Sequence, residues 1–231
     1  MEYYKTEFGI RFDELEASSE MEIDRNLQAL RASHKVFNKN YHELMYCLEH
    51  LKDPRQSLAM YFGDQSEQRK NLELLIDESS RLFHNFLASA MSLVEHTRII
   101  TTRLYPNNEF RHEYQTKVDQ EFLSNSASNL VQGLRNYTMH YTLPTLTLQI
   151  ICKGDIEMRV CLDVKILRQW NNWKKSTTYL ENLGDSLCLA SLSSEYFTLI
   201  ENFYRWLEDQ QIQLHQSDFD NLQKMKDELT T

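Results

Sequence analysis

Residues 27–51, LQALRASHKVFNKNYHELMYCLEHL, carry large side chains at alternating steps of three and four positions. The series is Leu27, Leu30, His34, Phe37, Tyr41, Leu44, Leu48 and Leu51. That spacing places them along one stripe of an α-helix, the side that packs against a core. We therefore predict a long helix from about Met21 to His50 with one buried face.

Two further long helices are predicted after the break at 52–54, where Lys-Asp-Pro interrupts the pattern. One begins near Ser66 and continues to the residues before Pro106, since proline disfavours helix in the residue preceding it. The next takes Asn107 or Asn108 as its N-cap and Glu109 in its first turn. It runs to about Thr142, where Pro144 stops it.

A different period appears in residues 145–164, TLTLQIICKGDIEMRVCLDV, where apolar residues alternate with period two around Lys-Gly-Asp. This pattern predicts a β-hairpin. A three-residue loop at 153–155 pairs Cys152 with Ile156 and Leu148 with Val160, which keeps one face apolar. A two-residue Gly-Asp loop would instead pair Gln149 with Val160 and mix the faces, so we prefer the longer loop.

The remaining segments complete the predicted fold. Asp163 is a candidate cap for a helix that ends at Gly184, another helix begins at Asp185-Ser186, and a short one follows Ser217. Residues 1–20 form a separate N-terminal segment, expected to be irregular or to contain a short strand because apolar residues alternate around Gly9. Residues 21–231 are predicted to be one all-α domain, a bundle of about five to six helices with an inserted β-hairpin at about 145–164.

Composition narrows the classes of function. The chain has 231 residues, a formal charge of −9 and only 5 Gly and 3 Pro, which favours long helices over many short strands. An acidic body lacks the broad basic surface that non-specific nucleic-acid binding needs. We expect a cytoplasmic protein with reduced cysteines and no membrane association, because neither a secretory signal nor an apolar run of membrane-spanning length is present. No metal or cofactor is expected, since no zinc motif, glycine-rich phosphate loop or dinucleotide fingerprint occurs.

The predicted helix over 107–142 carries an unusual polar stripe at steps of three and four: Glu121, Asn125, Asn129, Gln132, Asn136 and His140. Residues 124–134, SNSASNLVQGL, contain amides, hydroxyls and small side chains but no charge. A neutral amide-rich face of this kind suits contact with a second helix or subunit.

Arg135 and His140 follow at the end of this helix. A guanidinium group can hold two phosphate oxygens at once, and an imidazole can accept and donate a proton near neutral pH. Five residues of helix turn the two side chains about 140° apart, so they flank the stripe. Their chemistry suits phosphate-ester cleavage.

Residues 135–140, RNYTMH, resemble the RX4–6H motif, commonly RNxxxH, of HEPN domains (higher eukaryotes and prokaryotes nucleotide-binding). The resemblance implies a helical bundle and a metal-independent endoribonuclease of the toxin or phage-defence type. It also implies a homodimer in which two motifs meet, an RNA substrate and a protein antitoxin or regulatory partner. In this family pattern the RNA 2′-hydroxyl attacks its own phosphate, while His140 handles the proton, Arg135 holds the phosphate and Asn136 orients neighbouring groups.

Further residues are candidates to support such a site. Glu95 and His96 lie near the end of the second helix, and Tyr141 follows His140 directly, whereas one toxin subfamily carries a modifiable tyrosine at the place of Thr142. The basic, aromatic-bearing segment after the hairpin is a candidate for RNA binding through four cations: Lys165, Arg168, Lys174 and Lys175. The alternative for this segment is that its tryptophans are core and its lysines solvated.

A second class of function stays open beside the ribonuclease. The same neutral face of the helix over 107–142 is also what a non-catalytic helical interaction or scaffold protein would use to bind its partner.

Overall fold

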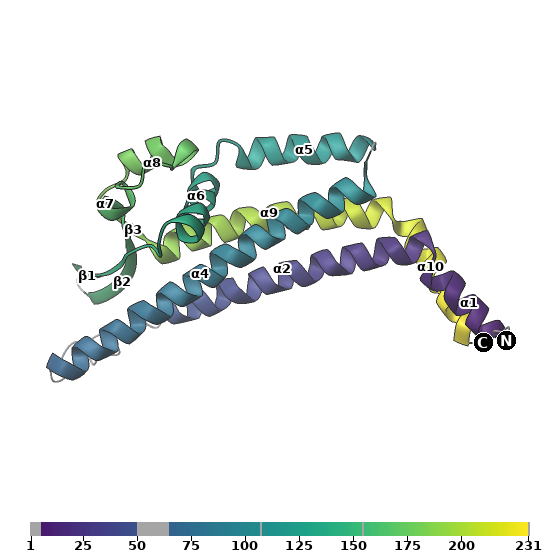
Figure 1. Ribbon diagram of the computed structural model, residues 1–231, viewed down its shortest axis with the longest axis horizontal. Coiled ribbons are helices and arrows are strands. Elements are labelled where there is room, and N and C mark those ends of the chain that lie inside the picture. Colours follow the sequence, from purple (N-terminus) through teal and green to yellow (C-terminus); the bar gives the residue numbers. More distant parts are fainter. Residues whose placement is uncertain (1–5, 50–64, 107, 154, 231) are drawn as a thin grey trace.

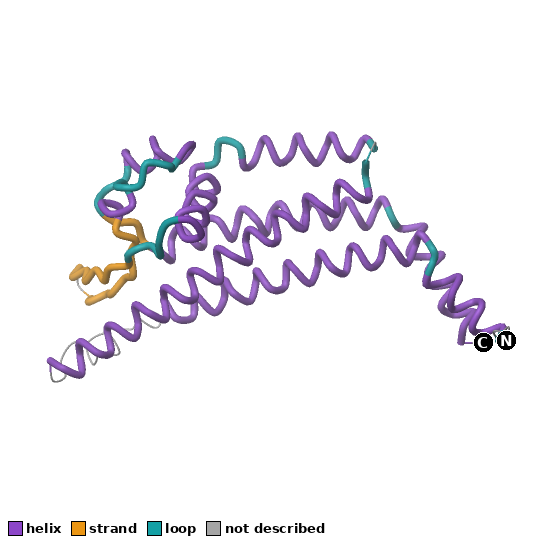
Figure 2. The backbone as a smooth tube through the Cα atoms, in the orientation of Figure 1, coloured by secondary structure: helices purple, strands orange, loops and turns teal. Residues whose placement is uncertain are grey.

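Three long helices form the body of the protein in the computed structural model, which describes residues 6–49, 65–106, 108–153 and 155–230 (Figure 1). They are α2 (Ser19–Glu49), α4 (Gln65–Leu104) and α9 (Leu189–Leu214). Helices cover most of the backbone, and a small antiparallel sheet is inserted at one end (Figure 2). The predicted class, a mainly helical fold with an inserted hairpin, is therefore confirmed.

The core lies where α2, α4 and α9 meet. Phe37 of α2 is fully buried, with its ring centroid 5.5 Å from that of Phe86 on α4 and 5.7 Å from that of Phe197 on α9. Leu30 and Leu44, each two turns away from Phe37 on the same stripe, are buried as well. The apolar periodicity of residues 27–48 thus corresponds to the face of α2 that packs inward.

The hairpin has the predicted register. Strand β1 (Leu146–Lys153) pairs with β2 (Asp155–Asp163) so that Cys152 faces Ile156 and Leu148 faces Val160. A third strand, β3 (Ser186–Cys188), pairs with the other edge of β2, so the helix predicted to begin at Asp185-Ser186 begins only at Leu189. Pairing with a distant strand prevails over the local helical pattern here. Strand β3 forms backbone hydrogen bonds with the edge of β2, whose N–H and C=O groups would otherwise lack partners in the sheet.

The expectation of a short strand near Gly9 is wrong. Residues Glu7–Glu16 form helix α1, capped by the Thr6 hydroxyl, which accepts a hydrogen bond from the Gly9 amide. Phe8 and Phe12 lie one turn apart with stacked rings, a contact that strand geometry would not allow. Helix α1 packs beside α10 (Gln216–Thr230) at the end of the body opposite the sheet (Figure 1).

The helix predicted over 107–142 is two helices, which is a second correction. Helix α5 (Glu109–Phe122) is capped by Asn108, one of the two predicted N-caps, and α6 (Ser126–His140) leaves it at a sharp angle (Figure 1). The Asn125 side chain accepts a hydrogen bond from the Ser128 amide at 2.9 Å and so starts a new helix. The predicted polar stripe is consequently divided, with Glu121 on α5 and only Asn129, Gln132, Asn136 and His140 on α6.

The helix predicted between Asp163 and Gly184 is also interrupted. Asp163 does cap α7 (Val164–Leu167), accepting from the Ile166 amide at 3.1 Å, but α7 has only four residues. A 3-10 turn, η2 (Lys174–Ser176), and α8 (Thr177–Asn182) follow. Trp173 lies between these segments, and its buried side chain donates from Nε1 to the carbonyl of Leu167, the last residue of α7, at 2.7 Å.

Candidate active site on helix α6

Helix α6 is held against a cluster of aromatic rings. Tyr137 is fully buried and stacks on Trp173, with ring centroids 5.4 Å apart, while Trp170 meets both rings edge-on. Gly133 allows a close approach, since a Cβ atom there would lie 2.9 Å from Cε3 of Trp173. This packing fixes the rotation of α6 and therefore which of its polar residues faces α4.

Arg135 is half-buried and faces α4. One of its terminal nitrogens donates to the Asn136 side-chain oxygen at 3.1 Å. Arg135 also lines a pocket of about 320 Å³ between the two helices, here called the α4–α6 groove. The polar groups around the groove are His84, Ser92, Glu95, His96, Arg135 and Thr138. The structure therefore brings together Arg135 and the two supporting candidates Glu95 and His96.

His84 belongs to this groove and was missed in the sequence. Its Nδ1 atom is buried and meets no hydrogen-bond partner in the part of the chain that the structure describes. His84, Ser92 and Glu95 recur along α4 at helical spacing, which is the signal that they share a face. That signal identifies a functional group only once α6 is known to lie across the same face.

The two supporting candidates on α4 are held by neighbours. His96 is exposed, and its Nδ1 lies 2.5 Å from the Ser33 hydroxyl of α2. Glu95 accepts from Arg98 at 2.6 Å in a solvent-exposed pair. The groove thus has a guanidinium on α6 and two imidazoles and a carboxylate on α4, groups that suit anion binding and proton transfer.

His140 and Tyr141 lie apart from this groove. His140 is the last residue of α6, is exposed, and is not among the residues that line the groove. Tyr141 is 60% exposed, with its ring against Tyr137 at 5.2 Å between centroids. A single chain therefore leaves Arg135 and His140 on different sides of α6, as their five-residue spacing predicts.

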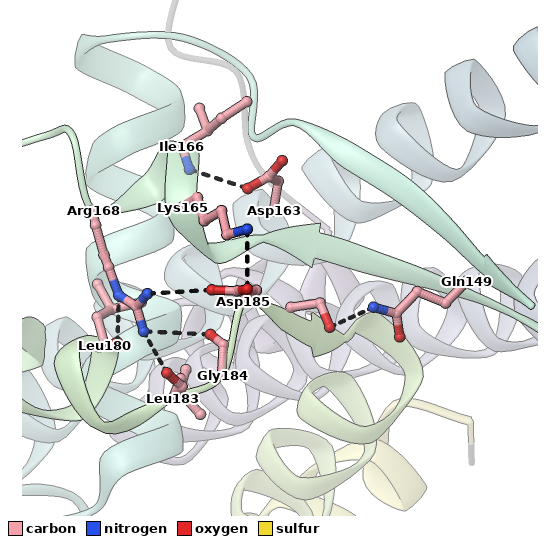
Figure 3. A network of polar contacts seen from close by, with 10 residues as sticks. Gln149, Asp163, Lys165, Ile166, Arg168, Leu180, Leu183, Gly184 and Asp185 are labelled. Atoms are coloured by element: carbon pink, nitrogen blue, oxygen red, sulfur yellow. Dashed lines mark hydrogen bonds and ion pairs between the residues drawn. The ribbon is translucent and has the colours of Figure 1, made fainter. Parts of the chain in front are cut away.

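The basic segment proposed for RNA binding is engaged largely in structural contacts (Figure 3). The Arg168 guanidinium donates to the carbonyls of Leu180 at 3.0 Å and Gly184 at 3.3 Å, and also to Leu183. Lys165 pairs with Asp185 at 3.0 Å. Lys174 and Lys175 are exposed beside the core residue Trp173, and their role in RNA binding stays a prediction.

A second pocket, of about 240 Å³, lies beneath α5 and is called the α5 pocket. Its walls are mainly apolar or aromatic side chains of α4, α5 and α9, among them Leu93, Phe122, Tyr196 and Phe203. Polar residues of α6 and its surroundings complete the lining: Asp119, Ser128, Asn129, Gln132 and Lys175. Part of the amide-rich sequence therefore lines a pocket within the chain.

Comparison with protein-family models, with curated proteins and with solved structures found no match to this chain. Among the described residues, no helix combines the length and the apolar character needed to cross a membrane. The same residues contain no group of three or more His, Cys, Asp or Glu side chains arranged to hold a metal ion.

Proposed function

We propose that this protein is a HEPN-like, metal-independent endoribonuclease that acts as a homodimer, with Arg135 binding the scissile phosphate and His140 transferring protons. The observation that carries the proposal is the α4–α6 groove, where Arg135 lies with His84, Glu95 and His96. These residues come from helices distant in sequence, and they supply the charge and proton-transfer groups that phosphate-ester cleavage requires.

The chemistry assigns each group a task. The Arg135 guanidinium, steadied by its hydrogen bond to Asn136, binds two non-bridging phosphate oxygens. An imidazole removes the proton from the RNA 2′-hydroxyl, whose oxygen attacks the adjacent phosphorus. The 5′-oxygen leaves with a proton, and the product ends in a 2′,3′-cyclic phosphate. In this proposal His96 assists from within the groove, and the second imidazole is the His140 of another copy of the chain.

In this proposal a second copy of the chain brings a His140 side chain close to Arg135, which a single chain does not do. Arg135 and His140 diverge on one α6, so a partner docked at the C-terminal end of that helix would bring its own His140 towards the groove. The exposed apolar residues that flank His140 in sequence support such contact: Met139, Tyr141 and Leu143 are 56%, 60% and 52% exposed. Apolar and aromatic side chains of this kind are enriched at interface centres.

RNA cleavage by purified protein in the presence of EDTA tests the proposal. We expect His140→Ala and Arg135→Ala each to lower the cleavage rate by about 10²-fold or more, with cyclic phosphate at the product ends. His112→Ala is the matched control, because His112 is an exposed histidine on α5, away from the groove. Cleavage that survives both site substitutions would refute the assignment.

The same assay separates the two histidine candidates. If His96→Ala abolishes cleavage while His140→Ala retains it, the catalytic imidazole belongs to the α4–α6 groove of a single chain, and cleavage does not require a dimer.

A cellular test addresses the proposed toxin class. Expression of the wild-type chain should arrest growth and His140→Ala should not, unless a protein partner restrains the enzyme.

A non-catalytic interaction protein is the second candidate function. The separation of His140 from the groove and the exposed trio Met139, Tyr141 and Leu143 favour it. In that case Tyr141→Ser should weaken self-association or partner binding, measured by sedimentation, while no substitution in the groove would alter an RNA substrate.

A further inference from the structure

Two cysteines face each other across neighbouring strands, and neither of them lines the α4–α6 groove. Cys161 of β2 and Cys188 of β3 are directly paired in the antiparallel register, and both are free thiols. Directly opposed residues in antiparallel strands have Cα atoms about 4.5–5.5 Å apart. Disulfides need about 4.4–6.8 Å. The backbone therefore already holds the two residues at disulfide distance, on the same face of the sheet.

Cys188 also occupies the N-cap position of α9, a helix of 26 residues. The Ser191 side chain and the backbone amides of Ala190 and Ser191 lie around its sulfur, although the Cys188 side chain makes no capping hydrogen bond. The positive end of a helix dipole stabilises a thiolate. The pKa of Cys188 falls to about 5, first through its interaction with the neighbouring Cys161 thiol and then through Ser191 and the backbone of Ala190 and Ser191, against an opposing effect of burial.

The surroundings give Cys188 access to a small reagent. Cys188 is half-buried and lines a pocket of about 150 Å³ together with Arg159, Glu157 and Ser191. Arg159 is the cation of this pocket and pairs with Glu157 at 2.8 Å. Space of this size suits a small oxidant rather than a protein substrate, and a nearby guanidinium suits a developing negative charge.

Cys161 is buried and positioned to act second. Its thiol lies 3.5 Å from the side-chain oxygen of Gln149. The Gln149 amide is oriented by donating to the Ser186 hydroxyl at 2.6 Å, the dashed line drawn from Gln149 in Figure 3. The interaction with Cys188 is the largest effect that raises the pKa of Cys161, ahead of burial. Once the Cys188 sulfur is oxidised, its negative charge is gone, and Cys161 becomes easier to deprotonate.

We propose that Cys161 and Cys188 form a peroxide-reactive dithiol site, with Cys188 as the attacking thiolate and Cys161 as the resolving thiol. The Cys188 thiolate attacks one oxygen of a hydroperoxide, an S–O bond forms, the O–O bond breaks, and the leaving oxygen takes a proton from solvent. Cys161 then attacks the resulting sulfenic acid, an S–S bond forms and water leaves. Two thiols are oxidised to one disulfide while one hydroperoxide is reduced.

Peptide mapping after exposure to one equivalent of hydrogen peroxide tests the site. In the wild-type protein we expect the Cys161–Cys188 disulfide as the main product, reversible by a thiol reductant. In Cys161→Ser, Cys188 should accumulate as a sulfenic acid that dimedone traps. Cys47 is the internal control thiol, because burial raises its pKa. Equal oxidation of Cys47 and Cys188, or no disulfide at full peroxide consumption, would overturn the proposal.

A measurement on the unsubstituted protein avoids any effect of the variants on folding. The rate of Cys188 alkylation by iodoacetamide should rise with pH through a midpoint near the pKa of about 5 and be level at neutral pH. An ordinary thiol keeps gaining reactivity up to a pH of about 8.5. A Cys188 profile that still rises above neutrality would contradict the site. The outcome is independent of RNA cleavage, so either proposal can fail alone.

Discussion

Replacing Gly133 by alanine tests how closely α6 is seated on the aromatic cluster beneath it. The added methyl group would lie 2.9 Å from Cε3 of Trp173 and 3.2 Å from the Ser176 hydroxyl. Neither neighbour can retreat easily. Trp173 is 4% exposed and tied to the Leu167 carbonyl, and the Ser176 hydroxyl donates to the Asn129 carbonyl at 2.8 Å.

Two opposing effects set the magnitude. Glycine in a helix interior is less favourable than alanine by about 1 kcal/mol, which the substitution recovers. Overpacking a close-fitting core costs about 1–3 kcal/mol. The expected result is therefore a loss in the free energy of unfolding of up to about 2 kcal/mol. An uncrowded helical glycine would instead give a gain of about 1 kcal/mol.

Urea unfolding followed by far-ultraviolet circular dichroism measures this difference without relying on Trp173 as the probe. Gly184→Ala is the control, because, its two chain neighbours aside, no atom of the described residues lies within 4 Å of the added methyl group. In a Trp173→Leu background the cost of Gly133→Ala should shrink or reverse, since the ring that it meets is absent. A gain of about 1 kcal/mol for Gly133→Ala in the wild type would refute the packing argument.

Other substitutions test contacts elsewhere. Arg168→Ala should lower the free energy of unfolding by about 1.5–3 kcal/mol, because the carbonyls of Leu180, Leu183 and Gly184 lose a charged donor, and Arg168→Lys should restore only part of this in urea unfolding. Asn125→Ala should cost about 1 kcal/mol by removing the α6 cap, while Asn171→Ala, at an exposed loop position, should be neutral. Tyr105→Phe should cost about 1–2 kcal/mol, since the phenol hydroxyl and His215 Nε2 are 2.9 Å apart. Burial raises the pKa of Tyr105 to about 12. The contribution of Tyr105 to the free energy of unfolding should therefore be fully present below a pH of about 10 and be lost as the pH rises towards 12. The free energy of unfolding of Tyr105→Phe, measured across the same range, should fall less.

Elements with a strong local pattern were predictable from sequence. The stripe of α2, the hairpin register and the caps Asn108 and Asp163 all depend on residues close together in the chain. The breaks were not predictable from period alone. Asn125 fits the polar stripe of one continuous helix as well as it fits a cap, and only the separate packing of α5 and α6 decides between them.

Features that depend on contacts between residues far apart in the chain could not be predicted from the sequence. Strand β3 has three residues and exists because β2 offers an edge, so local propensity for a helix start misled the prediction. The gathering of Glu95 and His96 beside Arg135 was anticipated only on the condition that the second and third helices pack together. His84 gives no signal until α6 lies across α4, and the opposed cysteines give none until β3 is known.

The way in which helix α5 is attached to the body allows it to unfold locally, separately from the long helices. Its contacts with the body include three aromatic pairs, Phe110 with Tyr105, Tyr114 with Phe203 and Phe122 with Phe203. One side-chain hydrogen bond, from Arg111 to the Thr102 hydroxyl at 2.6 Å, also joins it to α4. The α5 pocket lies beneath it, and the non-helical residues around Asn125 separate it from α6. Such a segment can detach while the long helices stay folded, so its amide hydrogens should exchange with solvent together, through a local opening, well before those of α2 and α9.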